Sequence, residues 1–267
     1  MTVDPFGRFV RNPAVRRRYE QTIDGLVQLL ADSEAVTVLS GAGISTASGL
    51  QDFRSKGGLW ENTDPMQECS LSAFRRDPAR FWAFYIARLT VHEDIKPNAA
   101  HEAIVELERM GKVKWVLTQN IDGLHQAAGS TRVVELHGSP ATVSCPSCGQ
   151  KVTWEEAMSM RDDAGVVPCE HGHPMKPDIV LFEERLPDQP FQRAHLALAS
   201  SDLLLCVGSS LVVHPVAGLP ALLVAGGGDV AILTGSSTPQ DALAQVKLTD
   251  PPLQELLPEA VRRLKLL

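Results

Sequence analysis

The sequence predicts an α/β fold in which a doubly wound parallel sheet carries a second, small inserted module. An apolar run of β-type residues, Val36 to Leu39, leads directly into Gly41 and Gly43, as in the first strand of a nucleotide-binding sheet. Short apolar runs then alternate with helical patterns along most of the chain. Residues 139–175 break this alternation, because they hold three cysteines and few large apolar side chains. These features together favour a Rossmann-like main domain with an insertion.

Length and composition limit the functions to consider. The chain has 267 residues, which suits one large domain, or one large and one small domain. Its formal net charge is −7, which argues against nucleic acid or an anionic membrane as partner. No apolar run approaches the ~18 residues of a membrane span, and the N-terminus has no signal-peptide core. We therefore expect a cytoplasmic protein, and we expect it to be a monomer.

The pattern of apolar residues predicts helices both before and after the first strand. It predicts a helix over residues 14–31, directly before that strand. Two helices follow within residues 70–90, since Ser70 suits an N-cap and Pro78 suits a first helical position. An amphipathic helix is expected from Asn98 to Met110.

The remaining strands are short apolar runs. We predict them at residues 114–117, 133–136, 179–182, 203–207 and 230–233, with a last helix over residues 252–264. Polar residues follow the first two, as expected of parallel strands whose carboxyl ends face a ligand crevice. The main domain should then comprise residues 1–138 and 176–267, with residues 139–175 as the small module.

The glycines after the first strand have a chemical reason. A side chain at Gly41 or Gly43 would stand between the backbone and a pyrophosphate, whereas bare backbone N–H groups can approach it at a helix N-terminus. The spacing, G-A-G-I-S, differs from the G-x-G-x-x-G of ordinary dehydrogenases. The loop favours a dinucleotide site, with a purely structural turn as the alternative.

His137 is a candidate general base, because it follows the predicted strand at 133–136. A neutral imidazole can take a proton from a hydroxyl near neutral pH. Either Glu135 or a backbone carbonyl would orient the ring. A structural histidine is the alternative.

Polar residues after the strand at 114–117 would meet His137 at the same sheet edge: Gln119, Asn120 and Asp122. Asn120 can hold a water or an amide through uncharged hydrogen bonds, and Asp122 can accept from a carboxamide N–H. The alternative for this segment is an Asx turn before a helix.

The cysteines of the insertion have the spacing of a zinc ribbon. Cys145 and Cys148 form a C-x-x-C, and Cys169 is a third thiol further along. Either His171 or His173 would complete a Cys3His tetrahedron. Such a site has no open position, so the zinc would be structural. The alternative is a module that folds without metal.

Five motifs, in order along residues 20–260, resemble those of the sirtuins, the NAD-dependent protein lysine deacylases. They are Gly41-Ala42-Gly43-Ile44-Ser45, Asp52-Phe53-Arg54, Thr118 to His125, Glu135-Leu136-His137-Gly138, and Gly208-Ser209-Ser210-Leu211 with Val213-His214-Pro215.

The resemblance implies that an acylated lysine and NAD give free lysine, nicotinamide and O-acyl-ADP-ribose. His137 would be the general base on the ribose hydroxyls, and Asn120 and Asp122 would form the nicotinamide pocket. Val180, Leu181 and Phe182 would bind the substrate peptide as an added strand. Part of 55–95 would form a helical module beside the cofactor and the acyl group. The implied cofactor positions are Gly41, Ala42, Gly43, Ser45, Asp52, Phe53, Arg54, Gln119, Asn120, Ile121, Asp122, His137, Gly208, Ser209, Ser210 and Thr234.

Tyr85 and Arg88 refine the expected acyl group. A Tyr-x-x-Arg pair here resembles the sirtuin subgroup that removes succinyl and malonyl groups. Residues i and i+3 share a helix face, and an arginine can bind a distal carboxylate through two hydrogen bonds. The alternative is a core tyrosine beside a solvent-facing arginine.

The sequence also departs from the sirtuin pattern. The fourth zinc cysteine is absent, Gln51 replaces a proline, Glu183 replaces a glycine, and Thr234 or a neighbour replaces an asparagine at the adenosine ribose. Three other functions remain as alternatives: protein mono-ADP-ribosyl transfer, NAD binding without catalysis, and an ordinary dehydrogenase. The last is disfavoured by the glycine spacing.

Overall fold

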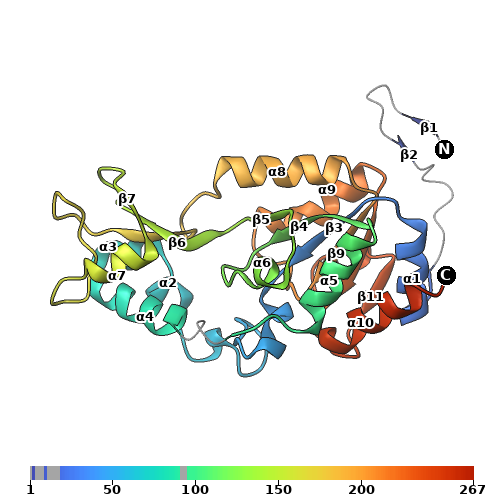
Figure 1. Cartoon of the computed structure of the whole chain (residues 1–267), viewed down its shortest axis with the longest axis horizontal. Coiled ribbons are helices and arrows are strands. Elements are labelled where there is room, and N and C mark those ends of the chain that lie inside the picture. Colours follow the sequence, from blue (N-terminus) through green and yellow to red (C-terminus); the bar gives the residue numbers. More distant parts are fainter. Residues whose placement is uncertain (1, 4–8, 11–18, 91–94) are drawn as a thin grey trace.

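The computed structural model describes residues 2–3, 9–10, 19–90 and 95–267 (Figure 1). Within these residues, a six-stranded sheet has the order β11-β10-β9-β3-β4-β5, and every neighbouring pair is parallel. This confirms the predicted doubly wound sheet. Its strands are β3 (Val36–Ser40), β4 (Val113–Thr118), β5 (Val133–Glu135), β9 (Leu203–Val207), β10 (Asp229–Leu233) and β11 (Val246–Leu248).

Helices cover both faces of this sheet. Alternate residues of β9 enter opposite cores: Leu203 and Leu205 face one set of helices, while Leu204 and Cys206 face the other. Because both faces are covered, β9 is apolar at all five positions rather than alternating. The first face carries α1 (Ile23–Asp32), α5 (Ala99–Arg109) and α10 (Leu253–Leu264), and the second carries α8 (Asp188–Ala199) and α9 (Leu219–Ala225).

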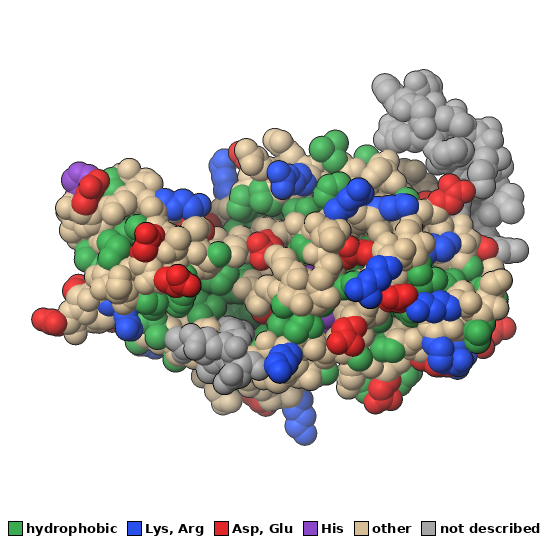
Figure 2. Space-filling model, in the orientation of Figure 1, with side chains coloured by type: hydrophobic (Ala, Val, Ile, Leu, Met, Phe, Trp, Pro, Cys, Tyr) green, Lys and Arg blue, Asp and Glu red, His purple; other side chains and the backbone are tan. Residues whose placement is uncertain are grey.

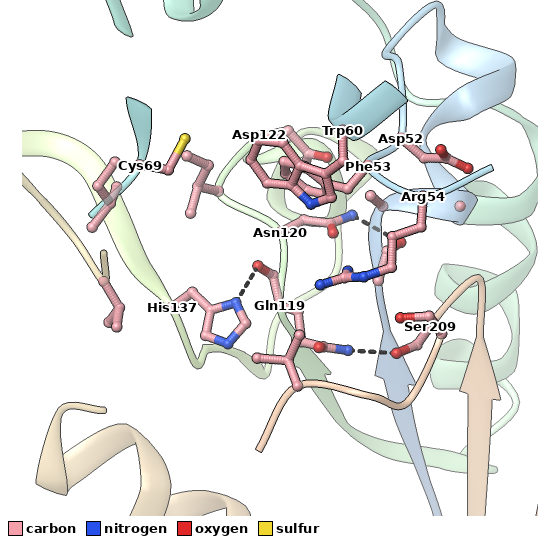
Figure 3. A pocket seen from close by; sticks show the side chains of 18 of the residues that line it. Asp52, Phe53, Arg54, Trp60, Cys69, Gln119, Asn120, Asp122, His137 and Ser209 are labelled. Carbon is pink, nitrogen blue, oxygen red and sulfur yellow. Dashed lines mark hydrogen bonds between the residues drawn. The ribbon is translucent and has the colours of Figure 1, made fainter. Parts of the chain in front are cut away.

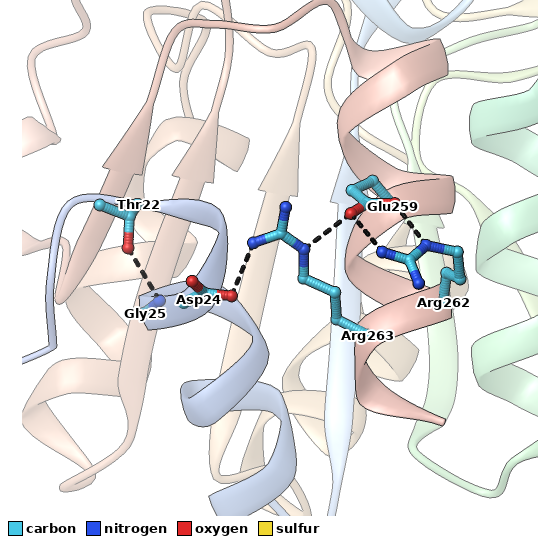
Figure 4. A network of polar contacts seen from close by, with 6 residues as sticks. All are labelled: Thr22, Asp24, Gly25, Glu259, Arg262 and Arg263. Carbon is cyan, nitrogen blue, oxygen red and sulfur yellow. Dashed lines mark hydrogen bonds and ion pairs between the residues drawn. The ribbon is translucent and has the colours of Figure 1, made fainter. Parts of the chain in front are cut away.

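An ion-pair network joins α1 to α10 (Figure 4). The Arg263 guanidinium donates to Asp24 of α1 and to Glu259 of its own helix, each at 2.7 Å. Hydrogen bonds from Arg262 and Arg263 lower the pKa of Glu259 to about 2. Because these groups lie near the surface, the apolar α1–α10 contact contributes more to stability than the ion pairs do.

A smaller module lies at one end of the molecule, on the left in Figure 1. It contains an antiparallel sheet of order β7-β6-β8 and shares one apolar core with the helices from residues 65–90. Trp82 is fully buried there and donates from Nε1 to the carbonyl of Met175 at 3.0 Å. The module comprises β6 (Gly138–Ser144), β7 (Lys151–Thr153), α7 (Trp154–Ser159) and β8 (Lys176–Ile179), packed on α2 (Pro65–Glu68), α3 (Leu71–Arg76) and α4 (Pro78–Thr90).

The predicted strand over 179–182 is wrong as a member of the main sheet. The strand is β8, which ends at Ile179 and pairs with β6 of the small sheet. Phe182 forms only an isolated bridge to Ser70. The small sheet therefore extends past the expected boundary at residue 175.

The helix predicted over 14–31 begins later than expected. Residues 14–18 lie outside the described part of the chain, and helix α1 starts at Ile23. The Thr22 side chain accepts from the Gly25 N–H at 3.1 Å, so Thr22 is the N-cap and fixes the start.

Two further elements differ from the prediction. The glycine loop leads into short 3-10 turns, Ala42–Ile44 and Thr46–Ser48, rather than into an α-helix. Strand β11 was not predicted at all. In contrast, α3 follows the predicted N-cap Ser70, and α4 begins at the predicted first position, Pro78. Helix α5 (Ala99–Arg109) lies within one residue of the predicted Asn98–Met110 at each end.

The other short elements are β1 (Thr2–Val3), β2 (Phe9–Val10), α6 (Leu124–Ala128) and 3-10 turns at Leu59–Glu61, Val216–Gly218 and Asp241–Leu243. Among the described residues, none of the helices has both the length and the apolar character needed to cross a membrane.

Candidate active site

A cavity of about 420 Å³ lies where the carboxyl ends of the parallel strands face the small module. Figure 2 shows hydrophobic side chains in the hollow between the two parts. The loops after β3, β4 and β9 contribute to its wall, as do His137 and the segment that follows β8. This is the position at which open parallel sheets bind ligands.

Three glycines bring two loops of this wall into direct contact. The Gly43 N–H donates to the Gly208 carbonyl at 2.8 Å. A Cβ at Gly43 would lie 2.8 Å from that same oxygen, and one at Gly41 would lie 2.9 Å from it. Gly208 itself has φ +62, and a Cβ there would be 2.3 Å from the Ile44 nitrogen. The bare backbone forms a surface that suits a pyrophosphate.

His137 is held in one orientation (Figure 3). Its Nδ1 lies 2.9 Å from the Gln119 carbonyl oxygen. A carbonyl oxygen only accepts, so Nδ1 carries the hydrogen and Nε2 of the neutral ring is a free base. Burial lowers the pKa of His137, although the hydrogen bond to Gln119 partly opposes this. The backbone carbonyl of Gln119, rather than Glu135, therefore orients the ring.

Asn120 and Asp122 are fixed by contacts with the glycine loop. The Asn120 Nδ2 donates to the Gly41 carbonyl and to the Ser45 hydroxyl, both at 3.2 Å. Ser45 Oγ donates to an Asp122 carboxylate oxygen at 2.7 Å, and the other oxygen accepts from the Leu124 N–H at 3.0 Å. The loops after β3 and β4 are therefore held together by these hydrogen bonds. The Asx turn that was the alternative for this segment is present, since Asp122 accepts from the Leu124 N–H.

Gln119 connects the same region to the loop after β9. Its Nε2 donates to Ser209 Oγ at 2.7 Å, as Figure 3 shows. Ser210 and Thr234 lie in the same cavity wall. The structure thus brings all the predicted cofactor residues to one cavity.

A cluster of aromatic side chains lines one wall of the cavity. Phe53 and Trp60 stack with ring centroids 5.0 Å apart, and Phe182 meets Trp60 edge-on at 6.3 Å. The Trp60 N–H donates to the Phe53 carbonyl through the main chain, at 2.9 Å, which closes the Asp52–Arg54 loop. Trp60 Nε1 is buried without a hydrogen-bond partner among the described residues. Sequence reasoning did not assign Trp60 to the site.

The segment Val180–Phe182, predicted to bind a peptide strand, runs beside His137. The N–H of Val180 donates to the His137 carbonyl at 2.8 Å, and that of Phe182 donates to the Cys69 carbonyl at 2.9 Å. The Leu181 N–H donates to the Glu184 carboxylate at 2.9 Å. All three amides are therefore engaged within the chain in this conformation.

A buried polar network beneath the site was also missed. Ser40 Oγ lies 2.8 Å from His125 Nε2 and donates to Thr118 Oγ1 at 2.9 Å. Thr118 Oγ1 in turn accepts from the Asn120 N–H at 3.0 Å. Because the Ser40 hydrogen goes to Thr118, His125 Nε2 must donate to Ser40. Ser40 ends β3, whereas Thr118 and His125 lie in the Thr118–His125 motif that begins at the end of β4. The only sequence signal for this contact was that both strands end at the same edge of the sheet.

This network predicts an acid-sensitive fold. Burial lowers the pKa of His125 to about 3, with the neighbouring His101 as a second cause. A histidine that is neutral when folded but charges near pH 6.5 when unfolded stabilises the protein above pH 6.5, and this stability is lost as the pH falls toward 3. For His125 alone, the loss between pH 7 and pH 5 should be about 2 kcal/mol.

Urea unfolding at both pH values measures this loss in the wild type and in His125→Gln, which does not titrate. We expect the variant to have a smaller pH dependence. His195→Ala, at an exposed histidine of α8, is the control and should keep the wild-type dependence. Equal pH dependence in the wild type and His125→Gln would contradict the prediction.

The small module holds the metal candidate. The Sγ atoms of Cys145, Cys148 and Cys169 lie within 4.8 Å of one another. Three thiolates that converge in this way suit a structural Zn²⁺. As the described residues lie, this group does not include His171 or His173, whose side chains are at the surface. None of the three cysteines lines the cavity, which fits a structural role.

Comparison with known proteins gives a consistent assignment. A family model described as the Sir2 family matches residues 41–215, well over half of the chain. The NAD-dependent protein deacetylase of Haloarcula marismortui is 40% identical over 250 residues, which cover 91% of this chain and 95% of the relative. The NAD-dependent protein deacylase of Thermus thermophilus is 40% identical over 223 residues, covering 82% and 86%.

Solved structures agree with the sequence relatives. A Sir2 enzyme studied for mechanism and regulation matches with a TM-score of 0.85 at 40% identity, covering 91% of this chain and 97% of that one. Sir2Tm bound to a propionylated peptide matches with a TM-score of 0.81 at 33% identity, covering 91% and 98%. The chain therefore belongs to the Sir2 family, the sirtuins, whose enzymes are NAD-dependent protein deacetylases and deacylases.

Proposed function

We propose that the protein removes acyl groups from protein lysines in an NAD-dependent reaction, with His137 as general base. The observation that carries this proposal is the single orientation of His137. Its Nδ1 hydrogen is held by the Gln119 carbonyl, and its free Nε2 belongs to a ring that burial keeps neutral. Such a nitrogen can accept a hydroxyl proton at neutral pH.

The residues around His137 suit NAD. Bare backbone at Gly41, Gly43 and Gly208 would hold the phosphates, and Ser209 would serve as a hydroxyl partner beside them. Asn120 and Asp122 would bind the carboxamide, while Phe53 would shield the reacting face from water. When bound, NAD supplies the ribose carbon that receives the acyl oxygen as nicotinamide leaves. The acylated peptide would lie along Val180–Phe182, and an added strand would pair with the Leu181 N–H once the Glu184 carboxylate releases it.

We also propose that the enzyme prefers dicarboxylic acyl groups, such as succinyl and malonyl, over acetyl. The Arg88 guanidinium lies 5.0 Å above the Phe53 ring and lines the cavity, as does Tyr85. Burial lowers the pKa of Arg88, so the charge is only partly solvated. Among the described residues, Arg88 forms no ion pair with a carboxylate. A carboxylate at the far end of an acyl chain would supply the missing partner.

Replacing Arg88 by methionine tests this preference. We expect Arg88→Met to lower kcat/KM for a succinyl-lysine peptide by about tenfold to a hundredfold, because a charge-assisted hydrogen bond contributes about 1.5–3 kcal/mol. The rate with acetyl-lysine should change little. Initial rates of nicotinamide release with both peptides measure the effect.

Arg80→Met is the matched control, since Arg80 lies on the same helix but pairs with Glu68 outside the cavity. It should leave both rates unchanged. If the wild type prefers acetyl-lysine over succinyl-lysine, the proposed acyl preference is wrong, although deacylation itself would stand.

Protein mono-ADP-ribosyl transfer is the second candidate, because it would use the same NAD site. The oriented base argues against it, since transfer to a protein nucleophile does not need a group that activates the ribose hydroxyl. Mass spectrometry separates the two activities. Deacylation leaves a peptide lighter by its acyl group, whereas transfer leaves a protein heavier by ADP-ribose.

A further inference from the structure

Two turns of the small module have the same backbone hydrogen-bond pattern. In the first turn, the Cys145 N–H donates to the Gln150 carbonyl at 2.8 Å, and the Gly149 N–H donates to the Cys145 carbonyl at 2.9 Å. Gly149 has φ +76. The cysteine that begins this turn is therefore hydrogen-bonded, through its N–H and its carbonyl, to the left-handed glycine and to the residue after that glycine.

The second turn repeats this pattern with one residue fewer. The Cys169 N–H donates to the His173 carbonyl at 2.9 Å, and the Gly172 N–H donates to the Cys169 carbonyl at 2.8 Å. Gly172 has φ +78, nearly the value at Gly149. Cys169 is thus the counterpart of Cys145, Gly172 of Gly149, and His173 of Gln150.

The residues that directly precede the two left-handed glycines then occupy equivalent positions in the two turns. In the first turn this residue is Cys148, whose Sγ belongs to the thiol group. In the second turn it is His171. The burial pattern repeats as well: Cys145 and Cys169, which open the turns, are buried, whereas Cys148 and His171 are exposed.

We propose that His171 is the fourth ligand of a Cys3His zinc site, and that His173 is not a ligand. An imidazole reaches further from its Cα than a thiol does, which compensates for the residue that the second turn lacks. In this structure the His171 ring faces Glu170, with Nδ1 3.8 Å from the carboxylate, and both side chains are more than half exposed. An exposed side chain of this kind is not held in its present rotamer by burial.

His173 has a different part in the turn. Its carbonyl accepts from Cys169, and its own N–H lies 3.3 Å from Cys169 Sγ and donates to it. Its carbonyl therefore has the same main-chain role as the Gln150 carbonyl in the first turn. The proposal concerns the small module only and does not depend on the acyl-lysine reaction.

Metal binding of the full-length protein tests the proposal without an activity assay. The measurements are zinc content, the rate of zinc release to a chromogenic chelator, and the absorption spectrum of the Co²⁺-substituted protein. We expect His171→Ala to weaken zinc binding by more than about tenfold, since even groups that only support metal ligands have effects of that size. His173→Ala is the matched control and should release zinc as the wild type does.

His171→Cys keeps the test decisive if the alanine variant does not fold. It should retain zinc and add thiolate-to-cobalt charge-transfer intensity relative to the wild type, because a fourth thiolate replaces an imidazole. Three results would overturn the proposal: wild-type zinc release in His171→Ala, loss of zinc in His173→Ala, or identical Co²⁺ spectra for the wild type and His171→Cys. A wild-type protein that binds no zinc would overturn it too.

Discussion

Replacing His137 by alanine is expected to lower kcat for deacylation by about two to four orders of magnitude, the contribution typical of a positioned general base. The ring is held by the Gln119 carbonyl and packs no apolar core, so the variant should fold normally. Steady-state rates with an acetyl-lysine peptide and saturating NAD measure the effect. KM for NAD should change much less than kcat.

The dependence of kcat/KM on pH should also reflect the protonation of His137. The base works only when neutral, and burial lowers the pKa of His137, so kcat/KM should stay high down to pH 6.5 and fall below it. His195→Ala, on the exposed side of α8, is the control and should keep the wild-type rate and profile. A His137→Ala enzyme with nearly wild-type kcat would remove this residue from the reaction.

Replacing Gly208 by alanine is expected to affect both folding and NAD binding. The residue has φ +62, and a Cβ would lie 2.3 Å from the Ile44 nitrogen and 2.6 Å from the Gly43 carbonyl carbon. Both neighbours are backbone, so the two loops must separate. Left-handed strain and overpacking together should lower the free energy of unfolding by about 2–4 kcal/mol.

The same separation should weaken NAD binding by about a hundredfold or more, because misplacement of a binding group by about 1 Å has effects of that size. Urea unfolding and titration calorimetry measure the two consequences. Gly235→Ala is the control, since nothing lies within 4 Å of its Cβ position and its φ is not left-handed. Unchanged NAD affinity in Gly208→Ala would mean that the contact between the two loops does not shape the cofactor site.

The main sheet could be predicted because its signal is local. Strands such as β9 are apolar at every position, and the start of α5 is marked in the sequence by the N-cap Asn98. The run at 179–182 was misassigned because four apolar residues indicate a strand but do not say which sheet it joins. Strand β11 was missed because Lys247 separates its two apolar residues, whereas β5, which is equally short, begins with two adjacent valines.

The site residues could be predicted from strand ends and from resemblance, but their contacts could not. The orientation of His137 depends on a carbonyl 18 positions away, and any residue type at 119 would supply that carbonyl. The pairing of Ser40 with His125 likewise arises only when β3 and β4 lie side by side. In contrast, the chemistry of Asn120 and Asp122 follows from their side chains once their positions are known.

The most direct test of the proposed function is the product balance of one reaction. The wild-type protein is incubated with NAD and a peptide that carries one acetyl- or succinyl-lysine, and nicotinamide, free-lysine peptide and O-acyl-ADP-ribose are quantified together. We predict that the three products form in equal amounts and that the rates of formation of all three fall by about two to four orders of magnitude in His137→Ala. Nicotinamide release with an unchanged acyl peptide and ADP-ribose attached to protein would contradict deacylation as the main activity.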